Sequence, residues 1–205
     1  MTPALTLASE DVAASPAFRH LSSIAGVKVD LRYAGPNNFV GRDLYSPFDC
    51  AWLHAEAAVA LEAAVAWLAA QAPGHTLLVL DALRPQRVQQ QLWDALAGTG
   101  LQMYLADPAR GSIHSYGMAL DVTILDPQGK ELDMGTGFDD MTNLSHPALE
   151  EGFLATGDLG EQQLAHRQLL RGAMFGAGFV GIRTEWWHFD CGDRDRVRST
   201  FSRVL

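Results

Sequence analysis

Four polar residues in two short segments have the types and the spacing of a metal-dependent hydrolytic site. His114 precedes Asp121 by seven residues, and Glu185 precedes His188 by three. Two imidazoles and one carboxylate form a three-ligand zinc set that leaves a fourth position for water, as in catalytic zinc sites. Glu185 would then be the base, because bound zinc lowers the pKa of water from about 15.7 to about 7 and the released proton needs an acceptor. For either segment alone, a core histidine hydrogen-bonded to a nearby acid is the commoner arrangement.

The elements that carry these residues impose a geometric condition. Both the later part of residues 112–125 and the segment T-E-W-W-H-F-D at 184–190 are typical of strands. Residues three or seven apart in a regular strand lie on opposite faces, so neither pair would reach one pocket from an unbroken strand. Gly117 offers a bend within the first pair, and we expect a kink or bulge near Trp186 within the second.

The remaining pattern predicts an α+β fold, with helices packed on a small, mainly antiparallel sheet. Apolar residues recur at helical spacing after Asp49, and Pro85 suits the first turn of a later helix. The stretch rich in Gly, Asp and Asn from Leu132 to His146 is expected to be a long ordered loop. Strands are expected at 27–31, 76–80 and 184–190, and helices from 49 to before Pro73, from about 85 to 98, and at 161–177.

Length and composition are those of one folded domain. The chain has 205 residues, of which 48% are hydrophobic and 19% charged, enough for one sizeable core. We therefore expect a single domain over residues 1–205, with residues 1–24 as a peripheral leader.

Charge and hydropathy exclude several classes of partner. The net charge of -9 is spread along the chain, and no run of Lys and Arg suits nucleic acid. The N-terminus does not have the pattern of a signal peptide. The alanine-rich stretch at 51–70 is too polar for a membrane span, because it contains His54, Glu56 and Glu62. A cytoplasmic enzyme or binding protein is the simplest interpretation.

The other histidines and the cysteines have ordinary interpretations. The two cysteines, Cys50 and Cys191, form no C-x-x-C pair, so neither a disulfide framework nor a Cys-based zinc site is indicated. Cys191 follows His188 by three residues, which leaves it open as a ligand, but a buried reduced thiol is preferred. Surface or capping roles are expected for His20, His54, His75 and His166.

Longer blocks around the polar residues resemble a known family. S-I-H-S-Y-G-M-A-L-D at Ser112–Asp121 is followed by E-W-W-H at Glu185–His188. D-L-R-Y-A-G-P-N-N-F-V-G at 30–41, D-A-L-R-P at 81–85 and D-M-G-T-G-F-D-D-M at 133–141 occur in the matching order. Together these blocks span residues 27–192 and resemble the D-alanyl-D-alanine dipeptidases, the zinc enzymes found in vancomycin resistance.

The resemblance implies a role for each residue of the reaction centre. One zinc ion per chain would be held by His114, Asp121 and His188, with Glu185 as the catalytic base. Arg84 would stabilise the oxyanion of the tetrahedral intermediate, a role that suits a permanently charged donor at the end of a strand.

The resemblance also implies how the substrate is held. Asp139 would bind the free amino group of the dipeptide, and Ser112 would help to bind substrate near the metal. Two structural alternatives stay open, namely a salt bridge from Arg84 to Asp81 or Glu56 and a loop-stabilising role for Asp139. The family pattern D-G-x-R-P has Ala82 in place of glycine here, which affects only the backbone beside Arg84.

These residues predict zinc-dependent hydrolysis of D-Ala-D-Ala or a closely related D,D-dipeptide, by Glu-assisted attack of zinc-bound water. The substrate would be a small D,D-dipeptide, used in cell-wall metabolism for antibiotic resistance or for recovery of D-alanine, between which the sequence favours neither. Three alternatives remain: a zinc D,D- or L,D-carboxypeptidase acting on longer cell-wall peptides, a non-catalytic binding protein with the same fold, and a structural zinc protein. The presence of both Glu185 and Arg84 argues against the second alternative. Structural zinc sites favour four protein ligands, usually thiolates, which argues against the third.

Overall fold

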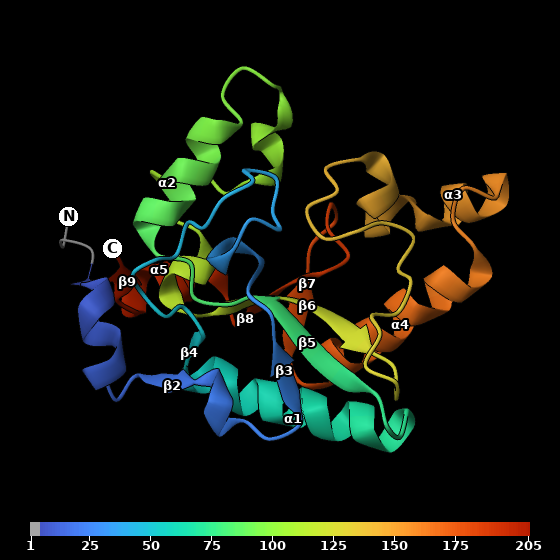
Figure 1. Ribbon diagram of the computed structural model, residues 1–205, viewed down its shortest axis with the longest axis horizontal. Coiled ribbons are helices and arrows are strands. Elements are labelled where there is room, and N and C mark those ends of the chain that lie inside the picture. The colour runs from blue at the N-terminus through green and yellow to red at the C-terminus, as the bar shows by residue number, and fades with distance from the viewer. Residues whose placement is uncertain (1–4) are drawn as a thin grey trace.

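A five-stranded sheet forms the centre of the computed structural model, which describes residues 5–205 (Figure 1). The strand order is β3-β5-β6-β8-β7, in which β3 and β5 are parallel and the other neighbours are antiparallel. The predicted α+β fold with a mainly antiparallel sheet is therefore confirmed. The strands are β3 (Val27–Val29), β5 (Thr76–Asp81), β6 (Ala119–Leu125), β7 (Phe179–Gly181) and β8 (His188–Cys191).

Two long helices, α1 (Ala55–Gln71) and α4 (Glu161–Gly176), pack against each other beside the sheet (Figure 1). Their close approach depends on Gly172 of α4, where a Cβ atom would lie 2.6 Å from the ring of Trp67. The buried positions of α1 recur with helical spacing, which is the pattern that predicted this helix. Shorter helices are α2 (Gln86–Ala95), α3 (Glu150–Thr156) and α5 (Arg194–Thr200).

The helix expected from Asp49 begins only at Ala55, so its predicted start was wrong. Residues Trp52–His54 form strand β4, which pairs with β2 (Phe18–His20), and this pairing overrides the helical pattern there. His54 then caps α1, because its Nδ1 accepts a hydrogen bond from the amide of Glu56 at 3.3 Å.

Both ends of the described chain meet in a second small sheet. Strand β1 (Thr6–Leu7) runs parallel to β9 (Arg203–Val204), and the two lie together at one side of the molecule (Figure 1). Among residues 5–205, no helix has the length and apolar character required to cross a bilayer. Short 3-10 helices occupy Ser9–Ala14, Leu21–Ser23, Arg32–Ala34, Leu101–Tyr104, Ile113–Tyr116, Asn143–Ser145 and Pro147–Leu149.

The bend predicted at Gly117 is present and separates a 3-10 helix from strand β6. Gly117 has a φ of 65°, a left-handed conformation that favours glycine. A Cβ atom here would lie 2.7 Å from the backbone nitrogen of His54 and 2.9 Å from the ring of Phe18, so no larger residue fits without movement. His114 therefore lies in the 3-10 helix, while Asp121 lies in the strand.

The irregularity predicted near Trp186 is also present. Strand β8 begins only at His188, and the chain bends at Trp186 and Trp187, so Glu185 lies in the preceding loop. Both tryptophan rings are buried. The parity of a regular strand therefore does not apply between Glu185 and His188.

The long loop between β6 and α3 is held in place by a buried arginine on α4. Nε of Arg167 donates to the carbonyl oxygen of Met134 at 2.7 Å, and Nη2 donates to that of Leu144 at 3.0 Å. Its charge is paired with Glu150 at 3.2 Å. The loop is therefore ordered, as predicted, because its backbone carbonyl groups find fixed donors.

Candidate metal centre and active site

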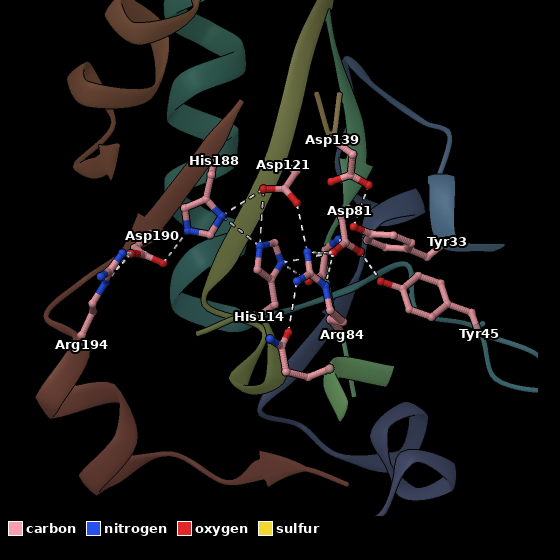
Figure 2. Close-up of polar contacts among 12 residues, drawn as sticks. Tyr33, Tyr45, Asp81, Arg84, His114, Asp121, Asp139, His188, Asp190 and Arg194 are labelled. Atoms are coloured by element: carbon pink, nitrogen blue, oxygen red, sulfur yellow. Dashed lines mark hydrogen bonds and ion pairs between the residues drawn. The ribbon is translucent and has the colours of Figure 1, made fainter. Parts of the chain in front are cut away.

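His114, Asp121 and His188 meet at the centre of the sheet. One possible ligand atom from each residue lies within 4.8 Å of the other two. Asp121 and His188 are register partners in the antiparallel strands β6 and β8, so their side chains lie on the same face. His114 approaches from the 3-10 helix before Gly117. Figure 2 shows the two imidazole rings beside the Asp121 carboxylate.

Hydrogen bonds around the cluster fix the tautomer of each histidine. Nδ1 of His114 donates to the carbonyl oxygen of Ala82 at 2.8 Å, so its Nε2 keeps a lone pair. Nε2 of His188 donates to Asp190 at 3.0 Å, so its lone pair is at Nδ1. These two ring nitrogens are 3.1 Å apart, and Oδ1 of Asp121 lies 3.0 Å from the second. Three electron-pair donors therefore converge on one position.

The charges around the cluster favour a cation there. Burial lowers the pKa of His188, but the carboxylates of Asp190 and Asp121 outweigh burial and raise it well above its usual value. A positive charge is thus stabilised at the point of convergence, either as a proton on the ring or as a metal ion. The donor set of two imidazoles and one carboxylate, each oriented by a further hydrogen bond, fits zinc with one coordination position left open.

Asp190 and Arg194 support His188 from behind. Nε and Nη2 of Arg194 lie 2.6 and 2.5 Å from Oδ2 of Asp190. Burial raises the pKa of Asp190, but His188 and Arg194 outweigh it and lower that pKa to about 2. The acid therefore remains ionised and acts as a fixed acceptor for the ring nitrogen.

A pocket of about 270 Å³ opens onto this cluster. Its size is close to the lower limit for small-molecule sites, which suits a small substrate. The structure brings every residue singled out from the sequence to this one pocket. These residues are Arg84, Ser112, His114, Asp121, Asp139, Glu185 and His188.

Arg84 lies buried between strand β5 and helix α2. Its Nη2 is 2.6 Å from Oδ2 of Asp81 and 3.2 Å from Oδ2 of Asp121. The structural salt bridge to Asp81 is therefore present, while Glu56 pairs instead with Arg196. Because Arg84 also reaches the second oxygen of Asp121, it orients a member of the cluster and lines the pocket.

Glu185 has an environment that suits proton transfer. It is half-buried in the pocket wall, and within residues 5–205 its carboxylate receives no hydrogen bond. Burial raises the pKa of Glu185 from its ordinary value of 4.5 to about 7, with His188 opposing the shift and Asp121 adding to it. A carboxyl group with a pKa near neutrality can both accept and return a proton at neutral pH.

Asp139 lies in the long loop with a backbone conformation unusual for its type. Its φ is 60°, in the left-handed region, and its Oδ2 accepts a hydrogen bond from the hydroxyl of Tyr33 at 2.8 Å. Burial raises the pKa of Asp139 well above its ordinary value, and Tyr33 opposes the shift. A cationic group entering the pocket would stabilise the ionised carboxylate. Ser112 is buried at the start of the 3-10 helix that carries His114.

Several residues of the site were not identified from the sequence. Asp190 follows His188 by two residues in one strand, so the period of two places both on one face and could have revealed it. Tyr33 reaches Asp139 from 106 residues away, and Tyr45 donates a hydrogen bond to Asp81. No local pattern indicates such long-range contacts. Cys191, left open as a ligand, is a buried thiol outside the three-residue cluster.

The chain is similar to known proteins over most of its length. The profile of a protein family described as Peptidase_M15, D-ala-D-ala dipeptidase, matches residues 18–205. A D-alanyl-D-alanine dipeptidase of Escherichia coli K12 is 38% identical over 164 residues, which cover 80% of this chain and 78% of that protein. One from Enterococcus faecalis V583 is 29% identical over 181 residues, covering 80% of this chain and 85% of the relative.

Proposed function

The chain belongs to the D-Ala-D-Ala dipeptidase family of M15 metallopeptidases, and we propose that it hydrolyses D-Ala-D-Ala with one zinc ion held by His114, Asp121 and His188. The observation that carries the proposal is the convergence of three electron-pair donors on one position beside an acid with a raised pKa. The family is metal-dependent, and a dipeptidase acts on a small dipeptide.

Hydrogen bonds hold the ligand atoms of the cluster in place before any substrate binds. The carbonyl of Ala82 and the carboxylate of Asp190 hold the two imidazole rings, while Arg84 holds the second oxygen of Asp121. Zinc in this position would polarise the scissile carbonyl and lower the pKa of the attacking water.

Glu185 moves the proton that hydrolysis requires. Its carboxylate accepts the proton of the attacking water and returns it to the amine that leaves when the peptide bond breaks. A pKa of about 7 suits both steps at neutral pH, since the group is neither too weak a base nor too weak an acid. A positioned carboxylate of this kind typically contributes about 10²- to 10⁴-fold to the rate.

Arg84 supplies fixed positive charge to the pocket wall. The guanidinium is held by Asp81, Gln89 and Asp121, so it needs no reorganisation when negative charge develops on the carbonyl oxygen. We assign it the stabilisation of the oxyanion, in addition to its contact with Asp121.

Asp139 recognises the free amino group of the dipeptide, with Ser112 close to the metal ligands. A buried carboxylate that demands a cation rejects an N-blocked peptide, because the blocked group leaves the acid without a partner. The hydrogen bond from Tyr33 keeps the carboxylate at a defined position in the pocket.

We also propose that the enzyme acts in the cytoplasm. Cys50 and Cys191 are both buried free thiols, which is typical of proteins in a reducing compartment. Fractionation of cells that express the intact protein, followed by immunodetection, would test the assignment, and recovery in an extracellular fraction would contradict it.

A substrate panel tests the proposed reaction. Zinc-loaded protein is incubated with D-Ala-D-Ala, L-Ala-L-Ala and N-acetyl-D-Ala-D-Ala, with the Glu185→Gln variant as control. We expect release of D-alanine from the first compound alone, with a loss of at least about 100-fold in the variant. Cleavage of none of the three would sink the proposal, equal cleavage of the acetylated compound would remove Asp139 from its role, and preference for the L,L compound would overturn the substrate.

A further inference from the structure

A free dipeptide carries two charges, and the residue roles of the proposed function account for only one of them. Asp139 is assigned to the ammonium group under the proposed function, whereas the C-terminal carboxylate has no assigned partner. A carboxylate is best recognised by the planar guanidinium group of arginine. Three arginines line the pocket, namely Arg84, Arg194 and Arg198.

Two of these arginines are already neutralised by carboxylates. Arg84 contacts both Asp81 and Asp121, and Arg194 contacts Asp190 through two nitrogens. Arg84 is also assigned to the carbonyl oxygen that becomes the oxyanion, and a carboxylate at Arg194 would compete with its existing pair. Arg198 is the remaining candidate.

Arg198 is held mainly by a neutral group, and its charge has only a long ion pair at the surface. Its Nε and Nη2 both donate to the carbonyl oxygen of Gly111 at 3.2 Å. Its Nη1 is buried and, within residues 5–205, has no hydrogen-bond partner. The acid beside it, Asp195, is 3.8 Å away and 87% exposed, while the Arg198 side chain is only 15% exposed. A buried guanidinium nitrogen without an acceptor is costly, and an incoming carboxylate would supply that acceptor.

The location of Arg198 matches the far end of a bound dipeptide. Arg198 follows Arg194 by four residues in α5, so the two share one face of the helix. Figure 2 shows Arg194 and Asp139 on opposite sides of the metal-ligand cluster. Burial lowers the pKa of Arg198, and the neighbouring charges of Arg110 and Arg194 lower it further, so positive charge gathers at this end. Asp139 thus lies on one side of the cluster and the arginines of α5 on the other.

We propose that Arg198 binds the C-terminal carboxylate of the dipeptide and so limits the length of the substrate at its C-terminal end. The proposal rests on the proposed function, because it assumes a zwitterionic dipeptide that spans the cluster from Asp139. A peptide extended or blocked at its C-terminus would leave Arg198 without its anion.

The test compares D-Ala-D-Ala with D-alanyl-D-alaninamide, which lacks the carboxylate charge. Zinc-loaded wild type is compared with the Arg198→Ala and Arg198→Met variants. Methionine keeps the apolar part of the side chain, so the second variant serves if the alanine variant does not fold. We expect wild type to favour the free acid by at least about tenfold in kcat/KM, mainly through KM, because a charge-assisted hydrogen bond is lost with the amide. Both variants should bring the ratio close to one. Arg196→Ala is the matched control, since Arg196 lies on the same helix but pairs with Glu56 outside the pocket.

A binding measurement separates substrate recognition from catalysis. The zinc-loaded Glu185→Gln protein is titrated with D-Ala-D-Ala and with the amide by calorimetry, with and without Arg198→Met. The added substitution should weaken binding of the free acid by at least about tenfold and leave the amide unchanged. If wild type cleaves D-Ala-D-Ala but its preference over the amide survives in both Arg198 variants, the inference is wrong and the proposed function stands. If wild type cleaves neither compound, the proposed function fails and this inference fails with it.

Discussion

Replacing Glu185 with glutamine should make the metal-free protein more stable at alkaline pH. The amide has nearly the same shape but cannot ionise, so it removes the cost of holding a charged carboxylate in the pocket wall. That cost is visible in the pKa of Glu185, which burial raises from 4.5 to about 7. Because the folded-state pKa lies above the unfolded one, the wild-type protein loses stability as the pH rises through this range.

The size of the effect follows from the two pKa values. A difference between 4.5 and about 7, at 1.36 kcal/mol for each pKa unit, corresponds to about 3 kcal/mol. This value is an upper limit, because the carboxylate opens onto a pocket that admits water. The stability difference between Glu185→Gln and wild type should therefore be constant below pH 4.5. It should increase between pH 4.5 and 7 and then level off.

Urea unfolding in the presence of a chelator, repeated from pH 4 to pH 9, measures this difference. Glu151→Gln is the matched control, since Glu151 is exposed on α3 and lies outside the pocket. The other ionisable groups are common to wild type and variant, so their contributions largely cancel in the difference. A difference that stays flat across the range, or one that falls as the pH rises, would refute the raised pKa of Glu185 in the folded protein.

Three further predictions follow from individual contacts. Asp190→Ala should weaken zinc binding by about 10- to 100-fold, because it removes the acceptor that orients the ring of His188. Competition with a chelator measures the zinc affinity, and an unchanged affinity would contradict this prediction. Gly117→Ala should destabilise the protein more than Gly129→Ala. Both glycines have positive φ, but only the first leaves no space for a Cβ atom, so equal melting temperatures for the two variants would contradict the close approach. Arg167→Met should lower the free energy of unfolding by about 3–5 kcal/mol, because the buried carboxylate of Glu150 loses one of its positively charged partners. A loss below about 1 kcal/mol would contradict this prediction.

The local parts of the fold were predictable because they depend on patterns within single segments. Apolar spacing indicated the helix at Glu161–Gly176, and the run of apolar residues indicated the strand at Thr76–Asp81. The bend at Gly117 followed from the mismatch between residue spacing and strand parity. The start of α1 was wrong because pairing between β2 and β4, which lie far apart in sequence, decided the conformation of 52–54.

The candidate site was likewise predictable where it depends on local patterns and not where it depends on long-range contacts. His114, Asp121 and His188 were singled out by residue type and by motif, and the structure brings them together. The network behind them was not foreseen, because contacts such as that of Tyr33 with Asp139 join segments that no local pattern relates. The bridge from Arg84 to Asp121, 37 residues further on, depends on the pairing of β5 with β6 in the same way.

Zinc titration of the metal-free protein, with hydrolysis of D-Ala-D-Ala measured at each step, tests the central claim most directly. Activity should rise in proportion to added zinc and level off at one ion per chain. His114→Ala and Asp121→Asn should bind zinc at least about tenfold more weakly than wild type, since each removes or weakens one of three ligands. Full activity in the chelated protein, or unchanged zinc affinity in both variants, would contradict a catalytic zinc ion held by His114, Asp121 and His188.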